Sequence, residues 1–173
     1  AVIMDGITMG GGVGLAMPSA VRIAPERTTY AMPETGIGLF PDVGGGWFLP
    51  RLPGAAGLWL ALTGARIKGA DCCALGISTH YMPSEKVEGF KAALLAHPAS
   101  VAGALAAFVE DPGLARTAAH QPDIDRLFAG DGVEAILADL EVEEGDWAAE
   151  QLATLATKSP QTMKVAFRQL KAG

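Results

Sequence analysis

The chain has 173 residues, of which 50% are hydrophobic, and a formal net charge of −6 at pH 7. This apolar content suffices for one sizeable core and argues against an intrinsically disordered chain. No Lys/Arg-rich run occurs, and binding to a phosphate backbone depends on clustered positive charge, so we expect no nucleic-acid partner. No apolar stretch reaches the ~18 residues of a membrane-spanning helix, so we expect no membrane partner.

Two local features bear on the cellular setting. Cys72 and Cys73 are adjacent, which matches neither a zinc site nor a CxxC redox motif, and they are predicted to be small buried residues in a reducing compartment. The chain starts at Ala1 within an apolar run and without an initiating Met, so we expect a fragment of a longer protein. We expect a cytoplasmic protein, or one of the mitochondrial matrix if a transit peptide precedes the fragment.

Strands are predicted in the first third of the chain. Short apolar runs at residues 2–4, 21–24 and 28–31 are separated by turn-forming residues. Two short helices are predicted next, over residues 54–63 and 69–75, the first of them ended by glycine. The start of the chain therefore indicates a mixed α/β fold.

Helices dominate the second half. Apolar residues recur at helical spacing over residues 87–94, 133–140 and 163–170. Residues 97–121 hold two prolines and two helical patches, which predicts a helical connector. Ser159 and Pro160 give the last helix an N-cap and a first-turn proline. The overall prediction is α/β, with strands in the first third and a helical C-terminal half.

A glycine-rich turn follows the first predicted strand, in the stretch DGITMGGGVGLAM. Gly10, Gly11 and Gly12 leave the backbone without side chains, and consecutive amides that enter a helix point their N–H groups at one spot. Such a turn suits an anion or a developing oxyanion, and the alternative is a packing corner without a ligand. The glycine spacing fits neither a dinucleotide fingerprint nor a Walker motif.

Two acids, Glu34 and Asp42, lie eight residues apart in the apolar, Gly/Pro-rich stretch MPETGIGLFPDVGGG. A carboxylate in apolar surroundings loses hydration, which raises its pKa toward the range in which it exchanges protons near neutral pH. Glu34 is therefore the candidate base, and the intervening loop can return both acids to one cavity. The alternative is structural: Glu34 caps a turn, and Asp42 is the N-cap of a helix that begins near Trp47.

These two stretches together resemble the crotonase superfamily, the enoyl-CoA hydratase/isomerase fold, and in particular its 3-hydroxyisobutyryl-CoA hydrolase branch. The resemblance continues through LALTGARIKGADCCALGISTHYMPSEK and KSPQTMKVAFRQL, so it covers nearly the whole chain. It implies a partial ββα superhelix. Residues 1–68 would form the C-terminal part of that core with the active-site loops, and residues 69–173 a helical region of the same domain.

The resemblance also implies an acyl-CoA substrate, with no cofactor besides the CoA of that substrate. Gly11 would be one oxyanion donor, flanked by Gly10 and Gly12. The second donor would lie on an earlier strand that this chain lacks, as would much of the CoA-binding surface. Because losing one donor typically costs ~10²–10³ in rate, the fragment itself is expected to be weakly active or inactive. The oligomeric state stays open and includes a homo-oligomer.

The acids indicate which reaction of the family to expect. Hydratases of the family use a second glutamate at the position that is Gly14 here, so hydration by the usual pair is disfavoured. The hydrolase branch retains Glu34 and Asp42, which implies hydrolysis of a 3-hydroxyacyl-CoA thioester, with 3-hydroxyisobutyryl-CoA of valine catabolism as the expected substrate. Glu34 would be general base or transient nucleophile, and Asp42 would orient water or the 3-hydroxyl.

Two other functions stay open from the sequence. One is an enoyl-CoA hydratase or isomerase of the same fold, and the other is a non-catalytic acyl-CoA-binding domain. A serine-hydrolase mechanism has no local support because no Gly-x-Ser-x-Gly motif occurs. The three histidines are far apart in sequence, so no metal site is expected. Four aromatic residues are predicted to line the core and the pocket: Phe40, Trp47, Phe48 and Trp59.

Overall fold

The computed structural model describes residues 1–173 and confirms the predicted order of short strands followed by helices. The β-strands are β1 (Val2–Ile3), β2 (Ile7–Thr8), β3 (Arg22–Ile23) and β4 (Thr29–Tyr30). The α-helices are α1 (Gly11–Ala16), α2 (Gly45–Phe48), α3 (Ala56–Thr63), α4 (Gly69–Ala74), α5 (Val87–Ala96), α6 (Val101–Phe108), α7 (Gln121–Leu127), α8 (Val133–Val142), α9 (Asp146–Ala156) and α10 (Pro160–Ala172). Four 3₁₀ turns complete the chain: η1 (Glu34–Ile37), η2 (Leu49–Arg51), η3 (Ser84–Lys86) and η4 (Thr117–Ala119).

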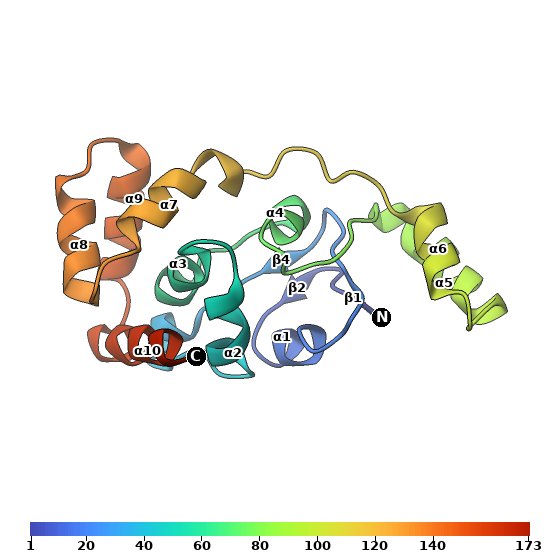
Figure 1. Ribbon diagram of the computed structural model, residues 1–173, viewed down its shortest axis with the longest axis horizontal. Coiled ribbons are helices and arrows are strands. Elements are labelled where there is room, and N and C mark those ends of the chain that lie inside the picture. The colour runs from blue at the N-terminus through green and yellow to red at the C-terminus, as the bar shows by residue number, and fades with distance from the viewer.

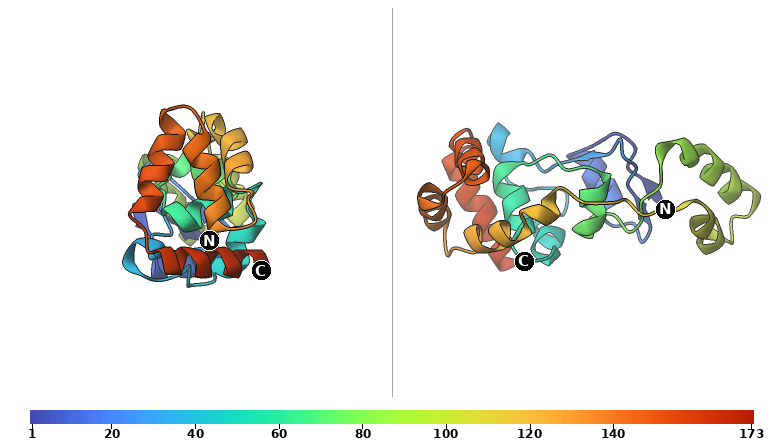
Figure 2. Two further views of the ribbon diagram at one scale, coloured as in Figure 1. Left: turned by 90° about the vertical axis from the view of Figure 1, so that its left-hand side faces the viewer. Right: turned by 90° about the horizontal axis from the view of Figure 1, so that it is seen from above.

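The molecule is elongated, with helices at both ends of a small strand layer. Figure 1 shows α8 and α9 at one end, α5 and α6 at the other, and the strands with α1 to α4 between them. The view from above in Figure 2 has the same order. The predicted connector, residues 97–121, contains α6 and η4, but an extended stretch joins them. None of the helices has the length and apolar character that crossing a membrane would require.

The strands pair in parallel, although they are far apart in sequence. β1 pairs with β3, and β2 pairs with β4 in a register that puts Ile7 beside Thr29 and Thr8 beside Tyr30. Because β2 and β4 run the same way, the segments that follow them leave from one edge. Those segments are the glycine turn before α1 and, a few residues after β4, the turn η1. Strand β2 has only two residues and is absent from the sequence-based prediction.

Helix α3 is the centre of the core. All eight of its residues, AGLWLALT, are buried, as expected for a helix that is apolar on every side. It contacts α7, α9, α10, η1 and η2. Trp59 within it donates its indole N–H to the side-chain oxygen of Gln151 on α9, at 2.9 Å. Helix α9, which the sequence-based prediction does not include, thus satisfies the polar atom of the largest core side chain.

The expected role of the four aromatic residues is half right. Trp59 and Phe48 are buried in the core. Trp47 is 66% exposed and Phe40 is 46% exposed, so neither is a core residue. The guanidinium of Arg51 lies 4.5 Å from the ring centroid of Trp47, a cation–π contact on the surface. Trp47 nevertheless lines a cavity together with Phe48 and Arg51, so only the core part of the prediction is wrong for this residue.

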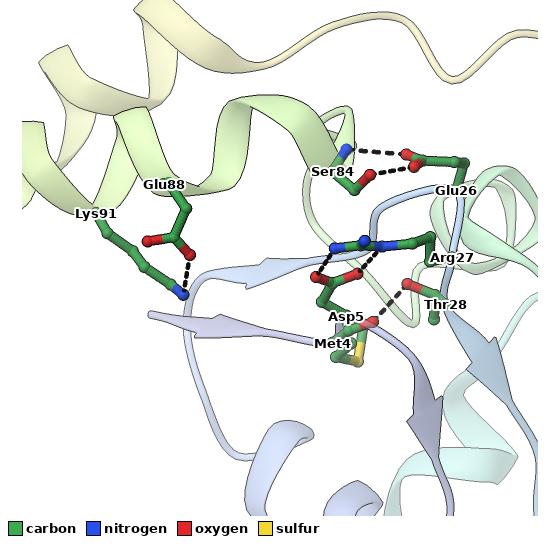
Figure 3. A network of polar contacts seen from close by, with 8 residues as sticks. All are labelled: Met4, Asp5, Glu26, Arg27, Thr28, Ser84, Glu88 and Lys91. Atoms are coloured by element: carbon green, nitrogen blue, oxygen red, sulfur yellow. Dashed lines mark hydrogen bonds and ion pairs between the residues drawn. The ribbon is translucent and has the colours of Figure 1, made fainter.

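The hairpin of α5 and α6 has its own small hydrophobic cluster, built around Phe90 and joined to the strand layer through Ile23. Polar contacts at its start tie it to the loop before β4, as Figure 3 shows. The carboxylate of Glu26 accepts hydrogen bonds from the amide and the hydroxyl of Ser84, and these bonds lower its pKa. Arg27 pairs with Asp5 beside it. Because these contacts are exposed, the apolar cluster provides most of the attachment.

The close packing of α3 on η2 gives a test of the core. A Cβ added to Gly57 would lie 1.9 Å from the carbonyl oxygen of Leu49, so Gly57→Ala must separate the two elements. We expect a loss of about 1–3 kcal/mol or more in the free energy of unfolding, measured by urea denaturation. Gly132→Ala is the control, since its nearest neighbour would be at 3.7 Å, and it should change the free energy by less than about 0.5 kcal/mol. Equal stability of the two variants would contradict this packing.

Candidate active site

The glycine turn is shaped by its first residue. Gly10 has φ 50° and ψ −124°, a conformation that side chains disfavour, and it turns the chain from β2 into α1. The amide of Gly12 donates to the carbonyl of Met9, and the amide of Val13 to that of Gly10, both at 3.0 Å. The amides of Gly10 and Gly11 donate to no acceptor in the chain. A donor at the start of α1 is thus available to an oxyanion, and Gly11 itself is exposed.

The segment that carries Glu34 is anchored from two sides. Thr35, the next residue, is fully buried and donates its hydroxyl to the carbonyl of Leu62 on α3, at 3.0 Å. The carbonyl of Thr35 accepts the amide of Ser159, the N-cap of α10, at 3.1 Å. Gly38 ends the turn with φ 80°. These contacts fix η1 against the core, so the side chain of Glu34 has a defined direction.

Glu34 is a buried carboxylate with a free oxygen. Its residue is only 4% exposed, and its Oε2 atom is buried without a hydrogen-bond partner. Burial raises the pKa of Glu34, and the negative charge of Asp42 raises it further. A basic oxygen that is poorly hydrated and unpaired is suited to take a proton from a reactant. The environment that the apolar sequence around Glu34 predicts is therefore present.

Asp42 lies in a strained loop rather than at a helix start. The N-cap of α2 is Gly44, which makes no side-chain cap, so the alternative that Asp42 caps this helix is wrong. Val43 has φ 45°, which is rare for a β-branched residue and costs of order 1–2 kcal/mol. Asp42 is exposed, whereas Glu34 is buried, yet the two charges are close enough to interact. The loop therefore holds the exposed carboxylate of Asp42 close enough to the buried carboxylate of Glu34 for its charge to act on it.

Val43 also connects this loop to the glycine turn. A Cβ added to Gly14 on α1 would lie 2.9 Å from the Cβ of Val43, so the two residues are packed together. Position 14 therefore has no room for a side chain unless Val43 moves. The pairing of β2 with β4 puts the glycine turn and η1 after neighbouring strand ends, and the contact of Val43 with Gly14 puts the Asp42 loop against α1. Figure 1 shows α1 and α2, which follow the glycine turn and the Asp42 loop, next to each other.

Three residues near the site are missing from the sequence-based prediction. Tyr30 at the end of β4 is fully buried, and its hydroxyl has no partner. Burial raises its pKa, with smaller contributions from other groups including Glu34. Lys158 approaches Gly36 in η1, and Gln169 on α10 donates to the carbonyl of Pro41. Only tertiary contacts identify Lys158 and Gln169, whereas a polar end in the apolar strand could have drawn attention to Tyr30.

No three His, Cys, Asp or Glu side chains lie close enough together to hold a metal ion. Cys72 is buried, as predicted, and Cys73 is half-buried. Burial raises the pKa of both thiols, so neither has the character of an activated nucleophile.

Comparison with known proteins defines the class. The family model described as enoyl-CoA hydratase/isomerase matches residues 1–173, so the chain belongs to this family, within the crotonase superfamily. Among curated relatives, the mitochondrial 3-hydroxyisobutyryl-CoA hydrolase of Xenopus tropicalis is 48% identical over 180 residues, and that of Homo sapiens is 42% identical. Each alignment covers 99% of this chain and 47% of the relative. The chain thus spans about half the length of these relatives. These relatives are named as mitochondrial proteins, and the cytoplasmic location expected for this chain stays a prediction.

Solved structures share the fold. A carnitinyl-CoA dehydratase from Mycobacterium thermoresistibile superposes with a TM-score of 0.92 at 42% identity, over 98% of this chain and 50% of that one. An enoyl-CoA hydratase from Rhodobacter sphaeroides 2.4.1 superposes with a TM-score of 0.88 at 39% identity, over 98% and 48%. The crotonase-like α/β fold is therefore confirmed. Because relatives of similar identity carry different activities in their names, similarity alone does not select the reaction.

The buried carboxylate predicts a stability change that needs no substrate. Its raised pKa means that the folded state binds a proton more tightly than the unfolded state, so stability falls as pH rises above the ordinary value of 4.5. Glu34→Gln removes this penalty. We expect the variant to gain stability over the parent protein near pH 8 and to lose most of that gain near pH 4, as measured by urea unfolding.

The matched control is Glu150→Gln, at an exposed carboxylate on α9. It should leave the pH dependence of unfolding unchanged. A Glu34→Gln variant that is less stable than the parent near pH 8 would show that the ionised carboxylate is well solvated or paired in the folded state.

Proposed function

We propose that this chain carries the catalytic groups of an acyl-CoA thioester hydrolase that acts on 3-hydroxyacyl-CoA, with 3-hydroxyisobutyryl-CoA as the substrate. The products would be 3-hydroxyisobutyrate and CoA, as in valine catabolism. The observation that carries the proposal is Glu34: a buried, unpaired carboxylate next to a second acid and on the same edge as the Gly11 amide. The resemblance to relatives named 3-hydroxyisobutyryl-CoA hydrolases supports the substrate.

The proposed reaction uses Glu34 first as a base and then as an acid. The ionised carboxylate of Glu34 accepts a proton from water, whose oxygen bonds to the thioester carbonyl carbon. The negative charge that develops on the carbonyl oxygen accepts a hydrogen bond from the N–H of Gly11. The C–S bond then breaks, the sulfur takes the proton from Glu34, and the acid and the free thiol leave. Asp42, at the exposed edge, accepts a hydrogen bond from the 3-hydroxyl or from the attacking water.

A variant of this step has Glu34 attack the carbonyl carbon directly. An anhydride then forms, CoA leaves, and water hydrolyses the anhydride. Single turnover in H₂¹⁸O tests for the anhydride, because its hydrolysis at the Glu34 carbonyl leaves ¹⁸O in the protein. Label in the Glu34 carboxyl would support the anhydride step, whereas the general-base step and hydrolysis at the substrate carbonyl both label only the acid product.

The principal test uses the protein encoded by the complete open reading frame. We expect release of free thiol from 3-hydroxyisobutyryl-CoA, detected with a thiol reagent, and a fall of ~10²–10⁴ in kcat for Glu34→Gln. The rate of the parent protein should rise with pH through the raised pKa of Glu34. Asp42→Asn should move this rise to lower pH, because it removes a like charge. An unchanged kcat in Glu34→Gln would eliminate the assignment.

A second function, hydration or dehydration of an acyl-CoA, is favoured by the names of the two solved relatives. Loss of enoyl absorbance from crotonyl-CoA, without release of thiol, would support it. The packing of Val43 on Gly14 counts against it, since no second carboxylate fits on α1 at this position. Binding of acyl-CoA without either reaction would indicate a non-catalytic domain.

A further inference from the structure

Helix α10 contacts both segments that carry the acids. At its start, the amide of Ser159 donates to the carbonyl of Thr35, the residue after Glu34, at 3.1 Å. Ten residues later, Nε2 of Gln169 donates to the carbonyl of Pro41, the residue before Asp42, at 2.8 Å. The two contact points are about 15 Å apart along the helix axis, since each residue adds ~1.5 Å. One rigid element thus spans both positions.

Gln169 holds the Asp42 loop at both ends. Besides the bond to Pro41, its side chain lies directly on Gly46, where an added Cβ would be 2.7 Å from Nε2 and 3.0 Å from Cγ. The amide is oriented by this contact, because its NH₂ group must face the carbonyl of Pro41. The Oε1 atom is buried and has no partner. The side chain of Gln169 is half-buried, and the bond to the carbonyl of Pro41 is the hydrogen bond that its amide group makes within the chain.

The loop needs such an anchor. Val43 and Gly44 both have positive φ, at 45° and 89°, and a strained backbone persists only where its surroundings hold it. The carboxylate of Asp42 makes no hydrogen bond or ion pair within the chain, so no side-chain contact fixes it. Its carbonyl accepts the amide of Gly45 at 2.6 Å, a bond within the loop itself. The position of the Asp42 carboxylate therefore depends on how the loop backbone is held.

We propose that Gln169 is a positioning residue: through Pro41 it holds Asp42 beside Glu34, and α10 sets the spacing of the two acids. The expected effect on kcat rests on the proposed function. The expected effect on the position of Asp42 rests on the contacts of α10 alone. Gln169 does not touch the reacting atoms. Its effect passes through the backbone of the Asp42 loop.

The first test replaces the amide by an apolar side chain of the same length. Gln169→Met in the complete protein should lower kcat for thioester hydrolysis by ~10- to 100-fold, since small misplacements of catalytic groups have effects of this order. KM should change by less than about threefold, because the proposed role of Gln169 involves no contact with the substrate. Gln161→Met, at an exposed glutamine on the same helix, should leave both constants unchanged.

The second measurement does not require turnover. NMR titration of the Glu34 carboxyl in the free protein should show a lower pKa in Gln169→Met than in the parent, because Asp42 moves away and its like charge no longer acts on Glu34. The other groups near Glu34 are the Tyr30 hydroxyl and the Lys158 ammonium, which approaches Gly36. Neither is hydrogen-bonded to Gln169, so their contribution should be the same in both proteins. This arm remains decisive if the protein hydrolyses no thioester.

Gly46→Ala provides a second variant, which tests the same contact from the side of the loop. The added methyl must displace the end of Gln169 from Pro41, while alanine within helix α2 favours the helix. We expect the same fall in kcat and the same lower pKa of Glu34, and the urea midpoint shows whether the variant is still folded. A native pKa of Glu34 in both variants would overturn the proposal, as would unchanged kcat in a protein that does hydrolyse the thioester.

Discussion

Burial of the Glu34 carboxylate is the constraint on which this structure depends. An acid placed in apolar surroundings without a partner for one oxygen lowers the stability of the folded chain, so the surrounding elements must hold it there. The bond from Thr35 to α3 and the bond from Ser159 to Thr35 do so from two sides. The same burial raises the pKa of the Glu34 carboxyl, which makes the carboxylate more basic than an exposed glutamate.

The site has a second unfavourable feature, the left-handed conformation of Val43 in the Asp42 loop. Its side chain packs on Gly14, and Gln169 holds the residues on either side of the loop. Strain of this kind persists only with support from rigid neighbours, and here the neighbours are α1 and α10. The fully buried helix α3 provides the apolar burial that offsets these costs. The apolar core therefore stabilises the folded chain, whereas the buried acid and the strained loop of the site destabilise it.

Most of the fold could be predicted from local patterns. The apolar face of α8 and the Ser159–Pro160 start of α10 appear at the predicted positions, because helical period and capping are short-range properties. Strand β2 could not be predicted, since two residues give no alternation to detect. The exposure of Trp47 and Phe40 could not be predicted either, because a residue between glycines and prolines has no period that assigns it to a face.

The sequence by itself determined the chemistry available at the site: glycines that leave amides free at a turn, one acid among apolar residues, and a second acid eight residues later. It did so because conformation at glycine and loss of hydration around a carboxylate depend on neighbours in the chain. Only the tertiary structure decided that β2 pairs with β4 and that Gln169 reaches Pro41 across 128 residues. Such contacts form when packing of the whole core fixes the positions of distant segments, and no local pattern specifies them.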